Sequence, residues 1–217
     1  VARIPDVVTS LRSTFRSRKT RTYSWRIEQL RQLKKMTIEM EAKIFSALRD
    51  DLGKSSFESR LTETGVELTE IDHALRHLRQ WMKPRTVGTP IANQPGYSEI
   101  VREPLGIVLI IAPWTYPFNL IVTPLIGAIA AGNCAVLKPS DLTPQTSSVL
   151  AEGISNYLDR DAVCVIEGGA EETSALLREE FDHIFFTGSP RVARLVMAAA
   201  AKQLTPVTLE LGGKNPC

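Results

Sequence analysis

The sequence predicts an α/β fold built on a Rossmann-like, doubly wound parallel sheet, and two features of residues 104–217 lead to this prediction. The first is an alternation of short apolar runs with stretches of helix length, which is typical of a parallel sheet covered by helices. The second is the absence of charged side chains from residues 104–137, as expected where strands and a helix are buried on both faces. The apolar runs are LGIVLIIA, CAVLKP, AVCVIEG, FDHIFFTG and TPVTLELGG.

The uncharged segment, residues 104–137, is also long enough to cross a lipid bilayer, so a membrane span is the competing interpretation. Glycine, proline and asparagine residues divide the segment into a run of strand length, a run of helix length and a second strand. We therefore predict a buried strand–helix–strand unit of a parallel sheet.

Residues 1–85 are predicted to form a helical region that contains two amphipathic helices. Apolar residues recur three or four positions apart over residues 24–52, and Gly53 follows as a helix stop. A second long helix is predicted for residues 58–82. Its apolar stripe consists of Leu61, Leu68, Ile71, Leu75 and Leu78.

Residues 86–103, TVGTPIANQPGYSEIVRE, are rich in turn-forming residues and end in an alternating run. This composition predicts an extended hairpin or edge arm between the helical region and the α/β domain of residues 104–217. An arm of this kind suits contacts between subunits.

The charge balance excludes a strong attraction to nucleic acid or to an anionic membrane, because 26 Lys and Arg residues face 24 Asp and Glu residues. Basic residues nevertheless crowd the region between residues 12 and 35, where Glu28 is the single acid. We interpret them as a solvated helix face rather than a binding patch. They are Arg12, Arg16, Arg18, Lys19, Arg21, Arg26, Arg31, Lys34 and Lys35.

The sequence predicts neither a disulfide framework nor a metal site. The three cysteines lie far apart without a CxxC pair, and no signal peptide precedes them, which indicates free thiols in a reducing, cytoplasmic compartment. His73 and His77 have a spacing that could hold a metal, but Asp72 is the one further ligand nearby. A surface pair is therefore preferred.

Ligands of a doubly wound sheet bind beyond the carboxyl ends of its strands, and a candidate anion site lies at one of them. In FTGSPRVARLV, a strand ends near Gly188, Ser189 suits a helix N-cap and Pro190 suits the first helical position. Free N–H groups at such a helix start attract an anion, most naturally a pyrophosphate. The same residues also cap helices that bind nothing, so this alternative remains.

A second polar cluster, LKPSD, follows the neighbouring predicted strand. It places Lys138, Ser140 and Asp141 where an acid accepts hydrogen bonds from ribose hydroxyls and a lysine donates to them. Two nucleotide-like features at neighbouring strand ends strengthen each other, so we predict a nucleotide site at this edge of the sheet.

A candidate general base, Glu210, ends the last predicted strand in LELGGK, where two glycines allow close approach of a backbone or cofactor. Because Leu209 and Leu211 flank it, the Glu210 carboxylate could be desolvated and act as a base. A carboxylate that accepts hydrogen bonds from N–H groups of a turn is the alternative.

These motifs together resemble the aldehyde dehydrogenase superfamily, and specifically its class 3 branch, which includes fatty aldehyde dehydrogenases. The resemblance covers nearly the whole chain and implies oxidation of aldehydes to carboxylic acids with NAD or NADP by a homodimer. A cysteine thiolate would add to the aldehyde, hydride would pass to nicotinamide, and a glutamate would activate the water that releases the acid. The matching segments are EPLGIVLIIAPWTYPFNL, GAIAAGNCAVLKPSDLTPQT, FDHIFFTGS and AAAKQLTPVTLELGGKNPC.

The resemblance also implies roles for individual residues. Glu210 matches the family's glutamate, and Thr115 stands at the catalytic oxyanion position. The positions that would contact the cofactor are Ala112, Pro113, Trp114, Lys138, Ser140, Asp141, Gly168, Gly188, Ser189 and Leu211.

The chain departs from the family pattern at three positions. In APWTYPFNL, Thr115 replaces an asparagine whose amide stabilises the oxyanion, and we expect a threonine at a helix start to cap free N–H groups instead. Asp141 replaces the usual glutamate, which leaves the preference between NAD and NADP open. Ala193 replaces the usual glycine.

The family's nucleophilic cysteine lies a few dozen residues beyond the LELGGK motif, which places it past Cys217. Cys217 follows the motif too closely, and Cys134 and Cys164 fall in predicted buried strands. We therefore expect the N-terminal part of an aldehyde dehydrogenase, inactive alone, whose aldehyde the sequence does not identify. A non-catalytic cofactor-binding or assembly protein is the competing hypothesis. Membrane association is not visible in this chain, although a C-terminal tail could provide it.

Overall fold

The computed structural model describes residues 4–213 and 215. Its centre is a five-stranded parallel sheet with the strand order β5-β4-β3-β6-β7, which confirms the predicted doubly wound α/β class. Each strand lies within the apolar run that predicts it. The strands are β3 (Ile107–Ile111), β4 (Cys134–Lys138), β5 (Val163–Val165), β6 (His183–Gly188) and β7 (Val207–Leu211).

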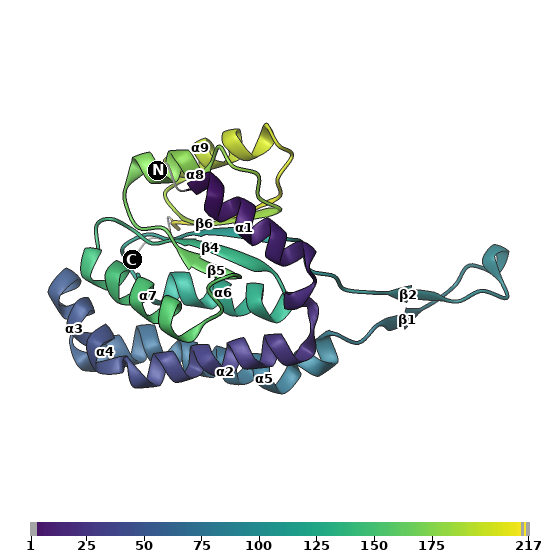
Figure 1. The fold of residues 1–217 in the computed structure, drawn as a ribbon, viewed down its shortest axis with the longest axis horizontal. Helices are drawn as coiled ribbons and strands as arrows, with labels where there is room; N and C mark the ends of the chain where they lie inside the picture. Colours follow the sequence, from purple (N-terminus) through teal and green to yellow (C-terminus); the bar gives the residue numbers. More distant parts are fainter. Residues whose placement is uncertain (1–3, 214, 216–217) are drawn as a thin grey trace.

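Helices cover both faces of the sheet, and one face carries two layers of them (Figure 1). Helices α6 (Asn119–Ala131) and α7 (Pro144–Tyr157) lie between the sheet and the N-terminal helical layer. The opposite face is covered by α1 (Ile4–Arg16), α8 (Ala170–Leu176) and α9 (Pro190–Ala201). The outer layer consists of α2 (Tyr23–Glu39), α3 (Glu41–Leu52) and α5 (Gly65–Trp81).

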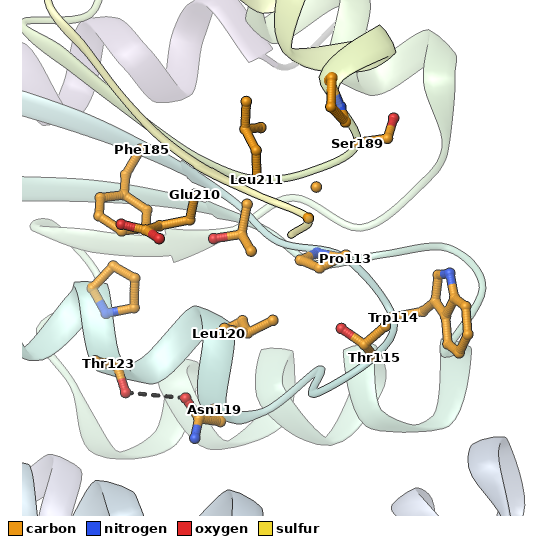
Figure 2. A pocket seen from close by; sticks show the side chains of 15 residues that line it. Pro113, Trp114, Thr115, Asn119, Leu120, Thr123, Phe185, Ser189, Glu210 and Leu211 are labelled. Atoms are coloured by element: carbon orange, nitrogen blue, oxygen red, sulfur yellow. Dashed lines mark hydrogen bonds between the residues drawn. The ribbon is translucent and has the colours of Figure 1, made fainter. Parts of the chain in front are cut away.

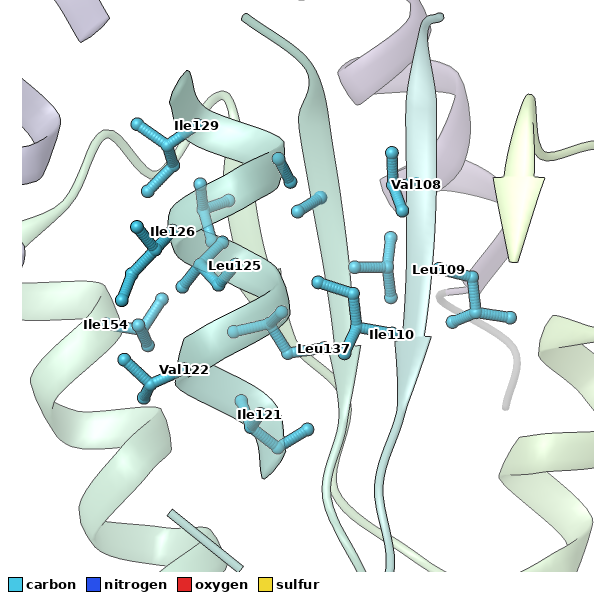
Figure 3. Packing of buried hydrophobic residues seen from close by; sticks show 14 of the residues in the cluster. Val108, Leu109, Ile110, Ile121, Val122, Leu125, Ile126, Ile129, Leu137 and Ile154 are labelled. Carbon is cyan, nitrogen blue, oxygen red and sulfur yellow. The ribbon is translucent and has the colours of Figure 1, made fainter. Parts of the chain in front are cut away.

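Helix α6 is largely apolar because protein packs on most of its sides. It packs on β3 and β4 on one side and on α2 and α5 on the other. Figure 3 shows Leu125 and Ile129 of α6 within the cluster that also holds Leu137 of β4 and Ile154 of α7. The predicted strand–helix–strand unit is therefore correct, and no helix in the described part of the chain is long and apolar enough to span a membrane.

The prediction of one continuous helix over residues 24–52 is wrong, because the chain turns at Met40 between α2 and α3. Met40 has φ −95° and ψ 5°, outside the helical range. Its side chain is buried, and its sulfur lies close to Gly153 of α7. The turn lets both helices follow the surface of α7, an arrangement that a helical periodicity cannot reveal.

The helix predicted for residues 58–82 is interrupted in its first turns by a π-helical segment. Its pieces are α4 (Ser56–Ser59), the π-helix η2 (Arg60–Thr64) and α5. The wider π turn changes which residues face inward. As a result, Leu61 of the predicted apolar stripe is 62% exposed, whereas Glu63 and Glu67 are fully buried.

The arm predicted for residues 86–103 is an antiparallel hairpin that projects from the rest of the molecule (Figure 1). It is formed by β1 (Arg85–Val87) and β2 (Ser98–Ile100), with the short helix η3 (Ile91–Asn93) between them. Ile91 and Tyr97 at its far end are exposed.

The basic N-terminal stretch is largely a solvated helix face, as predicted, with Arg16, Arg18 and Arg31 exposed. Arg26 is the clear exception. It is buried, and its guanidinium donates to the carbonyl oxygens of Thr20 in the short helix η1 (Lys19–Arg21) and of Ala130 in α6. The charge pattern alone could not separate this buried residue from its solvated neighbours.

Candidate functional site

A cleft opens at the carboxyl edge of the sheet, where the direction of the strand order reverses between β3 and β6. Ligands of doubly wound sheets bind at this position. The cleft has a volume of about 770 Å³. Its walls come from the turn after β3, the first turns of α6 and the ends of β6 and β7 (Figure 2). The predicted site residues that line it are Pro113, Trp114, Thr115, Gly188, Ser189, Glu210 and Leu211.

The turn after β3 presents Trp114 and Thr115 at one end of the cleft (Figure 2). The side chain of Trp114 is 47% exposed, and Thr115 is exposed as well. Lys54 supports this turn from behind. Its ammonium group donates to the Thr115 carbonyl oxygen at 3.0 Å and lies 4.1 Å from the centre of the Tyr116 ring.

Thr115 does not cap a helix, contrary to our sequence-based expectation. Helix α6 begins only at Asn119, and Glu63 of the π segment accepts hydrogen bonds from the N–H groups of Phe118 and Asn119 at 3.2 and 2.9 Å. A carboxylate at a helix start is favoured by the helix dipole. Because Glu63 occupies this position, the Thr115 hydroxyl remains available to the cleft.

Glu63 is paired with Lys54 in the protein interior. The Lys54 ammonium lies 2.5 Å from Glu63 Oε1, and the two side chains are 8% and 0% exposed. Burial raises the pKa of the Glu63 carboxyl, while the bonds from Lys54 and from the start of α6 act in the opposite direction. The pair thus ties the β3 turn, α6 and the π segment together.

The end of β6 has the local structure that the sequence predicts. Ser189 is the N-cap of α9, its hydroxyl accepts a hydrogen bond from the N–H of Val192 at 3.4 Å, and Pro190 is the first helical residue. Ala193, one turn further, is buried. The N-terminal end of α9 faces the cleft through Ser189 and Pro190.

The second polar cluster lies at the same edge of the sheet, after β4 and β5. Lys138 is 3% exposed, and its ammonium donates to the carbonyl oxygens of Pro139 at 2.7 Å and Gly168 at 2.5 Å. Burial lowers the pKa of Lys138. Asp141 is exposed and lies against Gly169. A Cβ atom added to Gly169 would lie 2.8 Å from the Asp141 carboxylate. Lys138 thus fixes the loop beside which Asp141 is presented.

Glu210 lines the cleft opposite α6, paired in the sheet with Thr187 of β6 (Figure 2). The expectation that Glu210 is desolvated is wrong for the described residues, because its side chain is exposed. The physical reason is that β7 is the outermost strand of the sheet that the described residues form. Leu211, which was expected to shield the carboxylate, is itself 42% exposed.

A sequence profile of the Aldehyde dehydrogenase family matches residues 2–217. The chain belongs to the aldehyde dehydrogenase family. Aldehyde dehydrogenase family 3 member B3 of Mus musculus is 52% identical to it over 95% of this chain and 43% of the relative, which confirms the class 3 resemblance.

Two solved structures extend the comparison. The substrate-bound AldH of Staphylococcus aureus shares 46% identity and a TM-score of 0.96, over 98% of this chain and 46% of that protein. An aldehyde dehydrogenase C mutant from Pseudomonas syringae, in complex with NAD⁺ and octanal, shares 27% identity and a TM-score of 0.86, over 99% and 43%. The chain therefore spans less than half the length of these relatives.

The cysteines in the described part of the chain are unsuited to nucleophilic attack. Cys134 is fully buried and Cys164, predicted to be buried, is partly exposed. Burial raises the pKa of both thiols to about 12, which disfavours the reactive thiolate. Cys217 lies outside the described residues.

The imidazole rings of His73 and His77 lie side by side on α5, tilted relative to each other, with a distance of 4.2 Å between their centres. The His77 ring stacks on Trp81. Within residues 4–213 and 215, no group of three His, Cys, Asp or Glu side chains could hold a metal ion.

Sequence reasoning missed Lys54, Glu63 and Glu67, which the fold places behind the cleft. The spacing offered a signal for the two acids, because residues 63, 67, 71, 74 and 78 recur three or four positions apart, as on one face of a helix. The structure buries all five of these residues. Acidic residues on an otherwise apolar helix stripe indicate buried polar contacts. Lys54 offered no comparable signal, since its partners come from distant segments.

Proposed function

We propose that the protein to which this chain belongs oxidises aldehydes to carboxylic acids with NAD or NADP. The observation that carries the proposal is the cleft at the switch point of the sheet, because it brings together Thr115, Ser189 and Glu210 from three separate strand ends. The family match and the arrangement of these residues support the same chemistry.

The residues at the carboxyl edge of the sheet fit a dinucleotide. Thr187 Oγ1 is buried beside the cleft and has no hydrogen-bond partner among the described residues, as expected of a group that awaits a ligand. The start of α9 suits a pyrophosphate, and Ser140 and Asp141 suit an adenosine ribose. When bound, the nicotinamide would accept a hydride from the substrate.

The remaining catalytic roles fall to Thr115 and Glu210. An exposed carboxylate at the end of β7 is free to accept a proton from water, which is the role the family resemblance gives to Glu210. The Thr115 hydroxyl would donate to the oxyanion. The nucleophile would be a cysteine beyond residue 217, and the hairpin β1–β2 would contact a second subunit of a homodimer.

The test follows NADH absorbance with a long-chain aldehyde and NAD⁺, using the 217-residue chain and the full-length protein in parallel. We expect turnover by the full-length protein, a large loss of turnover in its Glu210→Gln variant, and no turnover by the chain alone. If the chain alone oxidised the aldehyde, and Glu210→Gln abolished this turnover, the placement of the nucleophilic cysteine beyond residue 217 would be wrong.

Thr115 favours a second candidate, a non-catalytic cofactor-binding or assembly protein, because the family's oxyanion asparagine is replaced there. The same assay separates the two hypotheses. A full-length protein that binds NAD⁺ but oxidises no aldehyde would support the second candidate.

A further inference from the structure

A buried acid, Glu67 of α5, lies behind the α6 wall of the cleft. Its side chain is fully buried, and both of its carboxyl oxygens lie within hydrogen-bond distance of Thr123 Oγ1, at 3.1 and 3.2 Å. Thr123 lies on α6 and lines the cleft. Glu67 is therefore connected to the cleft through one hydroxyl group.

The contacts continue from Thr123 to Asn119, a second α6 residue of the cleft wall. Thr123 Oγ1 lies 3.2 Å from Asn119 Oδ1, a contact drawn in Figure 2, and Asn119 Nδ2 donates to the Thr62 carbonyl oxygen at 3.0 Å. A carbonyl oxygen can only accept, so the amide nitrogen must face Thr62. The amide oxygen of Asn119 is thereby directed at Thr123.

The protonation state of Glu67 decides whether every acceptor in this chain of contacts receives a hydrogen bond. The Thr123 hydroxyl has one hydrogen and stands between Asn119 Oδ1 and the Glu67 carboxyl group. An ionised carboxylate and an amide oxygen both only accept, so the hydroxyl could satisfy one of them and not the other. A protonated Glu67 removes the conflict, because it donates to Thr123 while Thr123 donates to Asn119.

The surrounding charges also favour a neutral acid. The charged groups that act on Glu67 are Glu63 and Glu70, both of them acidic. Lys54, the partner of Glu63, also donates to the Thr115 carbonyl oxygen, and Lys34 of α2 is paired with Asp72. Burial is the largest cause that raises the pKa of Glu67, to about 9.

We propose that Glu67 is a neutral carboxylic acid at physiological pH, which donates its proton to Thr123 and thereby fixes Thr123 and Asn119 on the α6 wall of the cleft. Glu67 is a positioning residue that acts through these two side chains. The inference concerns residues of this chain and does not rest on the proposed function.

Infrared spectroscopy of the full-length protein at pH 7 tests the protonation state directly. We expect a carboxylic acid band in the wild type that is absent from Glu67→Gln, and that disappears from the wild type as the pH rises through about 9. In Thr123→Val the band should remain but shift in frequency, because the acid loses its acceptor. The proposal would be overturned if the wild type and Glu67→Gln showed the same carboxylic acid bands at pH 7.

The pH dependence of unfolding provides a second measurement. The pKa of Glu67 rises from an ordinary 4.5 to about 9 on folding, so its contribution to stability is complete below about 4.5 and falls as the pH rises to about 9. Relative to Glu67→Gln, the unfolding equilibrium constant of the wild type should increase about tenfold per pH unit in this window.

The matched control is Glu99→Gln, because Glu99 is an exposed acid of β2 that is not among the charges acting on Glu67. It should leave the pH dependence of unfolding unchanged. A comparison of two substitutions gives a further check. Glu67→Gln retains a hydrogen-bond donor to Thr123, so it should be more stable than Glu67→Leu near pH 8. Equal pH dependence in the wild type and Glu67→Gln would contradict a neutral Glu67.

Discussion

Thr115 is exposed to the cleft, and nothing in the described residues engages its hydroxyl in helix capping, because Glu63 caps α6. The hydroxyl is therefore free to donate to an oxyanion. It is nevertheless shorter than an asparagine side chain and offers a single hydrogen that can rotate away.

We expect Thr115→Asn to raise kcat of the full-length protein and to leave NAD⁺ affinity almost unchanged. A well-placed oxyanion donor contributes about 10²–10³ in rate in comparable sites, which sets the upper limit of the gain. Steady-state kinetics and a separate NAD⁺ titration measure the two effects. A lower kcat in Thr115→Asn would show that the threonine is already an adequate donor.

Asp141 is one methylene shorter than the glutamate usual in the family, and it is exposed beside Gly169. The shorter side chain should form weaker hydrogen bonds with the ribose hydroxyls and leave room for a 2′-phosphate. We therefore expect weak discrimination between NAD and NADP. Asp141→Glu should shift the ratio of the two dissociation constants toward NAD. An unchanged ratio, measured by calorimetry, would mean that this position does not contact the ribose.

Individual residues were predictable from sequence where their partners are local. The capping of α9 by Ser189 depends on residues within three positions, and the structure confirms it. The exposure of Glu210 and the capping of α6 depend on strand order and on contacts between distant segments. The sequence expectations for these two features were wrong for this reason.

Helix α6 is held at both ends by the N-terminal helical layer. At its start, Glu63 accepts hydrogen bonds from backbone N–H groups, and at its end Arg26 and Thr20 donate to the carbonyl oxygens of Ala130 and Gly132. These contacts satisfy groups that a helix cannot pair internally. The outer layer therefore fixes the helix that forms one wall of the cleft.

Lys54→Met is expected to destabilise the chain by about 3–5 kcal/mol, because it leaves the buried Glu63 without its cation. Lys43→Met is the matched control, since Lys43 and Glu152 form a pair whose side chains are 60% and 45% exposed. Loss of this exposed ion pair should lower the free energy of unfolding by less than about 1 kcal/mol. Urea denaturation measures both values. Equal costs would show that the Lys54–Glu63 pair does not support the turn.

The helical elements were only partly predictable for a related reason. Periodicity located the helices of the N-terminal region, but it could not reveal the turn at Met40 or the π segment of residues 60–64. Both interruptions adapt a helix to the surface beneath it. The five strands were predicted well because each is short, apolar and bounded by local breakers.

The molecule as a whole directs the carboxyl ends of all five strands to one edge, and the candidate site occupies that edge. The cleft holds Thr115, Ser189 and Glu210, while Asp141 lies further along the same edge, after β4. This division matches a long ligand that extends from the cleft across the neighbouring strand ends. A dinucleotide has this form.

Isothermal titration calorimetry of the 217-residue chain with NAD⁺ tests this assignment most directly. We predict measurable binding that is weakened in Asp141→Ala and unchanged in Asp161→Ala, which alters an exposed acid that comes before β5, at the opposite edge of the sheet. Circular dichroism confirms that each variant is folded. A folded chain with no affinity for NAD⁺ or NADP⁺, or equal binding by both variants, would contradict the assignment of the cofactor site.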